Sequence, residues 1–138
     1  SRGRTGQEKK FWFEADPKLL ALARTLRDVP LANCDDAKKC LASKPQLVVS
    51  GNGVSGQAFV DNAAFREYTF KTFDASVLDM ETAATAMVAY ANGVPYIAFR
   101  SLSDLAGGGK GENEIETFFK LAAENSANVL MAFLKAWK

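Results

Sequence analysis

Acidic side chains are the first candidates for chemistry in this sequence, because its 138 residues include no histidine. The absence of histidine excludes serine and cysteine hydrolases that use a histidine base, and it excludes every histidine metal site. Proton transfer must therefore fall to aspartate, glutamate, lysine or tyrosine. One such acid, Asp104, lies in a glycine-rich stretch at 101–111 that we interpret as a loop. We expect no metal site.

A second candidate is the glycine pattern GNGVSG at 51–56, which follows an apolar run at 47–49. GxGxxG spacing occurs where backbone approaches a dinucleotide pyrophosphate, and Asp79 lies near the distance at which such sites place a ribose-binding acid. However, residues 59–61 intervene before the next helix signal, whereas that fingerprint has its last glycine at the helix start. A turn without a ligand is the simpler interpretation, and a dinucleotide-binding module is the weakest function that we consider.

The elements that would hold these groups alternate between helix and strand. Asp16 and Pro17 form a start signal for a helix that should end before Pro30, and Asp61 is placed to cap another. Short apolar runs predict strands, and amphipathic spacing predicts a long C-terminal helix. The expected strands are 47–49, 76–80 and 96–99, and the expected later helices begin after 61, span 81–90 and begin at 112. This alternation favours an α/β fold in one domain.

Cys34 and Cys40 lie in a connection over residues 31–46 that we expect to be irregular. Their spacing permits a loop disulfide, and two free thiols are the alternative. We favour the disulfide, and the pair is structural in either case. Two cysteines are too few for a four-ligand zinc cluster.

The composition, with 48% hydrophobic and 24% charged residues, is that of a folded globular domain. The 17 basic and 16 acidic residues leave a net charge of +1, so no field of one sign favours a nucleic acid or an anionic membrane. No apolar run approaches the ~20 residues needed to span a bilayer, and the opening residues are too polar for a signal-peptide core. We therefore expect neither a nucleic-acid partner nor a membrane.

A more specific signal comes from three segments in a fixed order. They are SGQAFV at 55–60, VLDMETAA at 77–84 and FRSLSDLA at 99–106. Together they resemble the nucleoside phosphorylase and nucleosidase superfamily, which includes methylthioadenosine/S-adenosylhomocysteine nucleosidases. The resemblance implies a three-layer α/β domain with a mixed central sheet flanked by helices. Residues 1–138 would then be the C-terminal portion of that single domain, without the N-terminal half that carries the phosphate site.

The resemblance implies a role for both acids that lie in these segments. Asp104 would protonate or hydrogen-bond the purine N7 as the glycosidic bond breaks, and an aspartate that caps the following turn is the alternative. Glu81 would accept hydrogen bonds from the ribose 2′ and 3′ hydroxyls, or would otherwise face the dipole of its helix. Ser103 would orient Asp104, and Arg100 would make a structural ion pair.

The same resemblance assigns the apolar contacts of the site. Phe59 would stack on the purine, and the backbone of Val60 would recognise the edge of the base. Met80 would pack against the sugar. For Phe59 and Met80 a position in the core is the alternative.

The implied function is binding of a purine nucleoside, adenine-containing, and cleavage of its N-glycosidic bond, with water or phosphate as co-substrate and no cofactor. No arginine follows Arg100, whereas bacterial hexameric phosphorylases place one there, so hydrolysis or simple adenine binding is favoured. The segments 10–26, 34–40 and 59–68 also resemble the plant branch of wound-inducible and bark or vegetative storage proteins. That branch implies the alternative, a storage or wound and defence-response protein that is vacuolar or secreted, with the cytoplasm as the other location.

A sheet of three or four strands would leave strand edges and apolar faces uncovered. We therefore expect the missing half as a companion chain or a neighbouring subunit, and we expect a homo-oligomer. The chain would in that case derive from a larger protein by cleavage or truncation.

Overall fold

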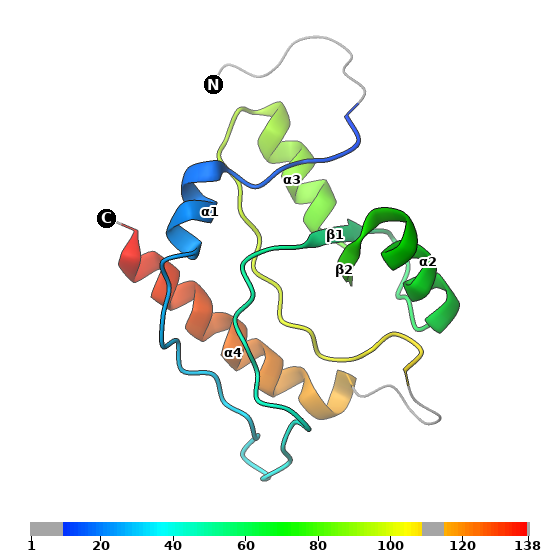
Figure 1. The fold of residues 1–138 in the computed structure, drawn as a ribbon, viewed down its shortest axis with the longest axis vertical. Helices are drawn as coiled ribbons and strands as arrows, with labels where there is room; N and C mark the ends of the chain where they lie inside the picture. The colour runs from blue at the N-terminus through cyan, green and yellow to red at the C-terminus, as the bar shows by residue number, and fades with distance from the viewer. Residues whose placement is uncertain (1–9, 109–114, 138) are drawn as a thin grey trace.

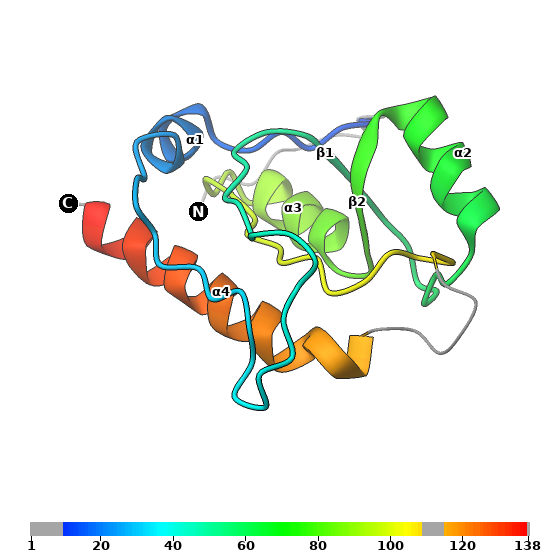
Figure 2. The same ribbon diagram turned by 60° about the horizontal axis from the view of Figure 1, so that its bottom comes forward.

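The computed structural model describes residues 10–108 and 115–137. The described residues form four helices and two strands, and the strands β1 (Asn52–Ser55) and β2 (Ala75–Asp79) make a two-stranded parallel sheet (Figure 1). The sheet and helix α2 (Ala63–Phe73) lie at one side of the molecule, and the long helix α4 (Ile115–Ala136) lies at the other (Figure 2). Helices and a parallel sheet together confirm the predicted α/β class.

The first helix, α1 (Pro17–Ala23), begins where the sequence predicts. The Asp16 carboxylate accepts hydrogen bonds from two backbone N–H groups of the first turn, and Pro17 occupies the position that needs no N–H donor. The helix ends at Ala23, so the predicted extension toward Pro30 is wrong. Asp28 has φ of 54°, a left-handed conformation that no continuing right-handed helix contains.

Strand β1 forms within the glycine-rich residues rather than at the apolar run before them. Its parallel pairing with β2 sets Val54 opposite Leu78 and Ser55 opposite Asp79. A strand exists only where a neighbour takes its backbone hydrogen bonds, and the assigned pairing with β2 begins after 47–49. Val48 is 70% exposed. The predicted buried strand at 47–49 is therefore wrong.

The glycine pattern at 51–56 does not form the turn of a dinucleotide site. Strand β1 occupies most of it, and α2 begins only at Ala63. The backbone amides of a helix start are therefore remote in sequence from the last glycine, which is the opposite of what pyrophosphate binding requires. Asn62, rather than the predicted Asp61, caps α2, with its side-chain oxygen accepting a hydrogen bond of 2.9 Å from the Phe65 N–H.

Strand β2 and helix α3 lie close to where the sequence predicts them. Strand β2 is offset by one residue from the predicted 76–80, and α3 (Thr82–Ala91) is offset by one from 81–90. Gly93, with φ of 65°, follows the end of α3 and takes a conformation that suits glycine. The parallel strands β1 and β2 are connected through α2, as parallel neighbours require.

The predicted third strand at 96–99 is not a strand in the described part of the chain. A single backbone bond ties this segment to the N-terminal segment, from the Asp16 N–H to the Tyr96 carbonyl at 2.7 Å. Phe99 instead packs edge-on against Phe133 of α4, with ring centres 5.1 Å apart. The sheet among the described residues is consequently one parallel pair, whereas the expected mixed sheet also requires antiparallel neighbours.

Helix α4 confirms the predicted amphipathic C-terminal helix. Its buried face repeats every four residues through Leu121, Asn125, Val129 and Phe133. Asn125 is polar and clamps the chain at Ala32, whose N–H donates to the side-chain oxygen at 2.8 Å and whose carbonyl accepts from the side-chain amide at 3.0 Å. Neither α4 nor another helix within the described ranges is long and apolar enough to cross a membrane.

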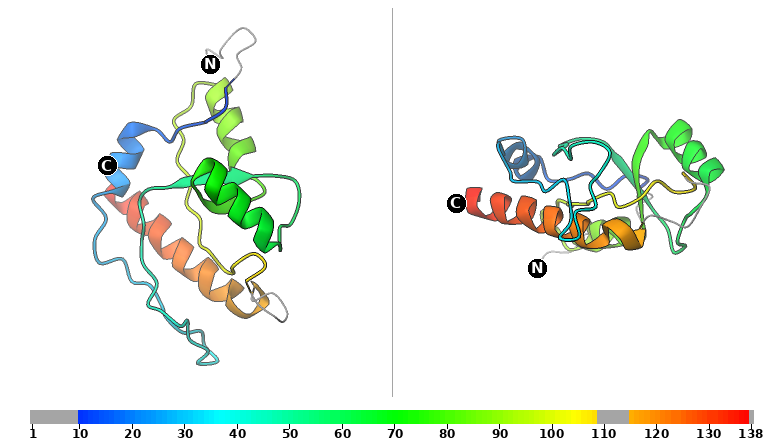
Figure 3. Two further views of the ribbon diagram at one scale, coloured as in Figure 1. Left: turned by 45° about the vertical axis from the view of Figure 1, so that its right-hand side comes forward. Right: turned by 90° about the horizontal axis from the view of Figure 1, so that it is seen from below.

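The connection at 31–46 is irregular, as predicted, and projects past α4 (Figure 3). Cys34 and Cys40 form a disulfide with an S–S distance of 2.06 Å, which confirms the favoured pairing. Lys120 on α4 makes an ion pair with Asp36, which lies within this disulfide loop. The connection is thus fixed by a covalent link and held to the long helix.

Candidate functional site

The residues that the sequence singled out surround one cavity of about 310 Å³, which we call the β2–α3 cavity. Its walls are residues 58–60, Arg66 of α2, strand β2 with the two residues between it and α3, and the segment 100–106. All of the predicted substrate and acid positions line it, namely Phe59, Val60, Met80, Glu81, Ser103 and Asp104. The volume is at the lower end of the range for small-molecule sites.

Strand β2 explains why Met80 and Glu81 reach this cavity. They directly follow its last residue, and in open α/β sheets ligands bind beyond the carboxyl ends of the strands. Met80 is 42% exposed and Phe59 is 60% exposed, so neither is a core residue. Their apolar surfaces are therefore available to a ligand.

Glu81 precedes α3, but its side chain makes no capping hydrogen bond to that helix. Its Oε2 atom instead lies 3.3 Å from Nη2 of Arg100. The carboxylate is exposed, and the single contact from Arg100 uses only part of its acceptor capacity. Glu81 thus faces the cavity segment rather than the helix, which favours the binding interpretation over the dipole alternative.

Asp79 also borders the cavity, and the sequence assigned it only to the rejected dinucleotide site. Burial would raise the pKa of Asp79, but hydrogen bonds from Ser55 and Thr82 and the charge of Arg100 outweigh it and hold the pKa below its ordinary value. The side chain is 3% exposed and lies 3.3 Å from Nε of Arg100. Asp79 is therefore an ionised carboxylate at the junction of β1, β2 and α3.

The segment 101–108 carries Ser103 and Asp104 to the cavity. Asp104 is half-buried, and its Oδ1 atom accepts a hydrogen bond of 2.8 Å from the Ser103 hydroxyl, the contact expected of an orienting serine. The segment is docked on the start of α2, because the Gly107 N–H donates to Asp61 at 2.6 Å and the Arg66 guanidinium donates to the Ala106 carbonyl. Asp61 thus fixes this segment rather than capping α2.

Gly107 is the residue whose replacement should disturb this docking most. Its φ is +65°, and a Cβ atom there would lie 2.2 Å from the backbone nitrogen of Ala63. We expect Gly107→Ala to destabilise the docked segment by about 2 kcal/mol and to weaken ligand binding in the cavity, since Asp104 would move with it. Thermal unfolding and adenine titration measure the two effects.

Gly56→Ala is the matched control for this glycine. A Cβ atom at Gly56 meets no atom within 4 Å, and its φ is not positive. The same substitution should therefore be close to neutral there. Equal effects at Gly56 and Gly107 would contradict the docked arrangement.

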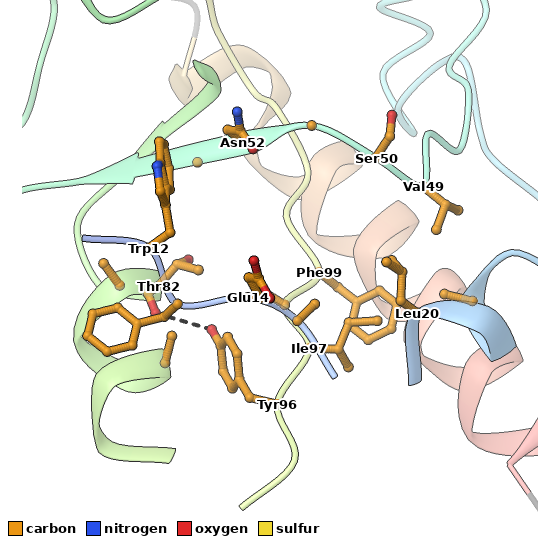
Figure 4. Close-up of a pocket in the computed structure, with 18 of the residues that line it drawn as sticks. Trp12, Glu14, Leu20, Val49, Ser50, Asn52, Thr82, Tyr96, Ile97 and Phe99 are labelled. Atoms are coloured by element: carbon orange, nitrogen blue, oxygen red, sulfur yellow. Dashed lines mark hydrogen bonds between the residues drawn. The ribbon is translucent and has the colours of Figure 1, made fainter. Parts of the chain in front are cut away.

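A second, larger hollow is bordered by β1 and has a volume of about 950 Å³, and we call it the central hollow. Figure 4 shows Trp12, Asn52, Tyr96 and Phe99 around it, from the N-terminal segment, β1 and the segment 96–99. The Tyr96 hydroxyl donates to the Thr82 carbonyl at 3.2 Å, and burial together with the nearby Asp79 charge raises the Tyr96 pKa. None of the predicted site residues lines the central hollow.

Within residues 10–108 and 115–137, no group of three or more potential ligands is placed to hold a metal ion. The functional groups that the cavity does offer are carboxylates, hydroxyls, two guanidinium groups, an aromatic ring and a thioether. These groups can stack on a flat apolar base, accept hydrogen bonds from hydroxyls, and hold or donate a proton.

Comparison with known proteins gives one family for nearly the whole chain. The family model described as the phosphorylase superfamily matches residues 2–135. No solved structure matches the chain.

The similar curated proteins are of two kinds. A 5′-methylthioadenosine/S-adenosylhomocysteine nucleosidase of Halalkalibacterium halodurans is 35% identical over 68% of this chain and 38% of its own length. The nucleosidase of Treponema pallidum is 35% identical over 67% of this chain and 35% of its own length. Bark storage protein A of Populus deltoides is 26% identical over 71% of this chain and 29% of its own length. The chain thus spans about a third of the length of these relatives, and the match over 2–135 shows that it belongs to the phosphorylase superfamily.

Proposed function

We propose that the β2–α3 cavity binds a purine nucleoside that contains adenine and cleaves the bond between its base and its ribose. The observation that carries this proposal is the meeting of Phe59, Glu81 and Asp104 around one cavity, although they come from three separate segments. They supply an aromatic face, a carboxylate acceptor and an acid, which are the groups that this cleavage needs. Membership of the superfamily, with nucleosidases among the similar proteins, supports the same reaction.

In this proposal the base lies on the Phe59 ring with N7 toward Asp104. The exposed ring offers an apolar face for stacking, and Val60 lines the same cavity, so that its backbone would recognise the edge of the base. Ser103 holds the Asp104 carboxyl group through its hydroxyl. The base is then fixed between a face contact and an edge contact.

The ribose lies toward Met80 and Glu81. The Glu81 carboxylate accepts hydrogen bonds from the 2′ and 3′ hydroxyls, while Arg100 holds one of its oxygens from the protein side. The Met80 side chain covers the apolar side of the sugar.

The reaction requires one proton and one nucleophile. When the bond between N9 and C1′ breaks, its electron pair moves onto the purine, and Asp104 gives a proton to N7 so that the base leaves neutral. The sugar becomes cationic in the transition state, and water forms the new bond to C1′ and loses a proton, which returns through solvent to the Asp104 carboxylate. A carboxyl group poised in a partly water-excluded cavity lowers the barrier of such a step.

Hydrolysis is favoured over phosphorolysis because both arginines at the cavity already bind protein acceptors. Arg66 donates to the Ala106 carbonyl, and Arg100 is paired with both Asp79 and Glu81. A phosphate co-substrate needs cations that are available for bidentate contacts. In the described lining of the cavity, both guanidinium groups already serve protein acceptors.

Calorimetric titration of adenine tests the binding half of the proposal. We expect Phe59→Ala to weaken adenine binding about tenfold, because the stacking face is removed. Phe70→Ala is the matched control, since Phe70 is 57% exposed, close to the 60% of Phe59, and does not line the cavity. Equal affinities in both variants, or weaker binding only in Phe70→Ala, would refute the proposed placement of the base.

A storage or defence-response role is the second candidate. The observation that favours it is the similarity to bark storage protein A over 71% of the chain. For this role we propose a vacuolar or secreted location, because the Cys34–Cys40 disulfide is typical of oxidising compartments. A protein that binds adenine but releases none from a nucleoside would support storage over catalysis.

We also propose that residues 1–138 are the C-terminal portion of one domain, and that the central hollow receives the rest of it as a companion chain or a neighbouring subunit. The support is that the chain spans about a third of its relatives, and that the apolar segments at 47–49 and 96–99 border the hollow without sheet partners in the described residues. A strand from elsewhere that pairs with such segments would stabilise them. A homo-oligomer is one way to supply it.

A further inference from the structure

Arg100 connects two carboxylates that have different surroundings. Its Nε atom lies 3.3 Å from Oδ2 of Asp79, and its Nη2 atom lies 3.3 Å from Oε2 of Glu81. The Asp79 side chain is 3% exposed, whereas that of Glu81 is 66% exposed. One end of this chain of contacts is therefore buried, and the other is exposed.

The buried end is rigidly held. Asp79 sits opposite Ser55 in the strand register and accepts hydrogen bonds from the Ser55 hydroxyl, the Thr82 hydroxyl and the Thr82 N–H, the last at 3.2 Å. Ser55 in turn accepts from the Ala83 N–H at 2.9 Å. Asp79 is thus fixed by β1, β2 and the first turn of α3 together.

The exposed end has no comparable support. An ion pair between long exposed side chains is weak, because water screens the charges and both side chains lose freedom when they pair. Arg100 is 42% exposed and, without a second partner, would not keep Glu81 in one orientation. Its contact with Asp79 removes this freedom, because a guanidinium group is planar and fixing one edge of it fixes the other.

We propose that Asp79 is a positioning residue for the ribose site, which acts through Arg100 to hold the Glu81 carboxylate toward the sugar. This inference rests on the proposed function, because it assumes that Glu81 receives the ribose hydroxyls. The low pKa of Asp79 is consistent with it, since the carboxylate stays charged and keeps Arg100 in place. Asp79 also borders the cavity, but its side chain is 3% exposed and its carboxylate is engaged by Ser55, Thr82 and Arg100, so in this proposal it acts on the sugar through Arg100.

The test compares two ligands that differ only in the sugar. The probes are 9-deazaadenine and 9-deazaadenosine, in which a carbon–carbon bond joins base and ribose, so the nucleoside is not cleaved during calorimetry. Asp79→Asn keeps the size of the side chain and removes its charge. We expect it to weaken 9-deazaadenosine binding about tenfold and to leave 9-deazaadenine binding within about twofold, because only the sugar contacts depend on Glu81.

Two further variants separate positioning from folding. Arg100→Gln breaks the link while leaving the Ser55 and Thr82 contacts of Asp79, and we expect the same loss for the nucleoside alone. Adding Asp79→Asn to Glu81→Gln should cause no further loss, since both act on one contact. Glu67→Gln removes an exposed ion pair with Lys71 on α2 and should change neither affinity.

Each outcome decides the matter. If Asp79→Asn and Arg100→Gln lose affinity for both probes, or for neither, the positioning role is refuted, but the proposal of a purine site is not. Additive losses in the double variant would also overturn it. If the wild type binds neither probe, the proposed function fails, and the inference fails with it.

Discussion

The Asp104→Asn variant is expected to release adenine from methylthioadenosine about 10²- to 10⁴-fold more slowly than the wild type, as is typical when a general acid is lost. Asparagine preserves the shape of the side chain and can still accept the hydrogen bond from Ser103, which is 2.8 Å long. It has no carboxyl proton to give to N7. The purine would then have to leave as an anion, so the barrier rises while the fold is retained.

Asp74→Asn is the control for the change of charge. Asp74 ends α2 with φ of 51°, a left-handed conformation that asparagine also adopts, and it does not line the cavity. Its variant should keep the wild-type rate. An Asp104→Asn variant that retains the wild-type rate of adenine release would exclude Asp104 as the acid.

The Phe133→Ala variant is expected to lower the free energy of unfolding by about 3–5 kcal/mol, the usual cost of deleting a buried aromatic ring. Phe133 is 1% exposed and contacts the rings of Phe99 at 5.1 Å and Trp137 at 5.8 Å between centres. The contact with Phe99 joins α4 to the segment that leads to Arg100. Urea unfolding followed by tryptophan fluorescence would measure the loss.

Phe119→Ala on the same helix separates core packing from general loss of apolar surface. Phe119 is 65% exposed, so its truncation should change the free energy of unfolding by less than about 0.5 kcal/mol. Similar losses for Phe119→Ala and Phe133→Ala would show that the core does not lie where the structure places it.

The elements that the sequence predicted well are those that local signals determine. Asp16 and Pro17 begin α1, and Gly93 follows the end of α3. In α4, buried residues recur every four positions as far as Phe133. Each of these signals involves neighbours within a few positions. The disulfide of Cys34 was predictable for the same reason.

The strands show where such signals fail. Residues 47–49 and 96–99 have the composition of buried strands, yet the strand pair forms at 52–55, where the sequence suggests only a turn. Pairing with β2 decides this, and pairing is a contact between residues far apart in the chain. The contacts of Asp79 with Ser55 and of Asn125 with Ala32 were missed for the same reason.

The sequence predicted which residues line the candidate site, but it did not predict the contacts that hold them in place. Three short motifs identified Phe59, Glu81 and Asp104, and the structure brings them around one cavity. The motifs did not indicate that Arg100 connects Glu81 to a buried partner, or that Asp61 holds the segment that bears Asp104. Those contacts depend on how the segments meet in space.

The most direct test of the central proposal is the release of adenine from methylthioadenosine by the wild-type protein, followed by chromatography with and without phosphate. We expect adenine together with the free sugar in both conditions, because in the proposed reaction Asp104 protonates the base, Glu81 holds the ribose and water is the nucleophile. No adenine from a folded protein, or adenine only when phosphate is present, would contradict the account of this site as a hydrolytic nucleosidase.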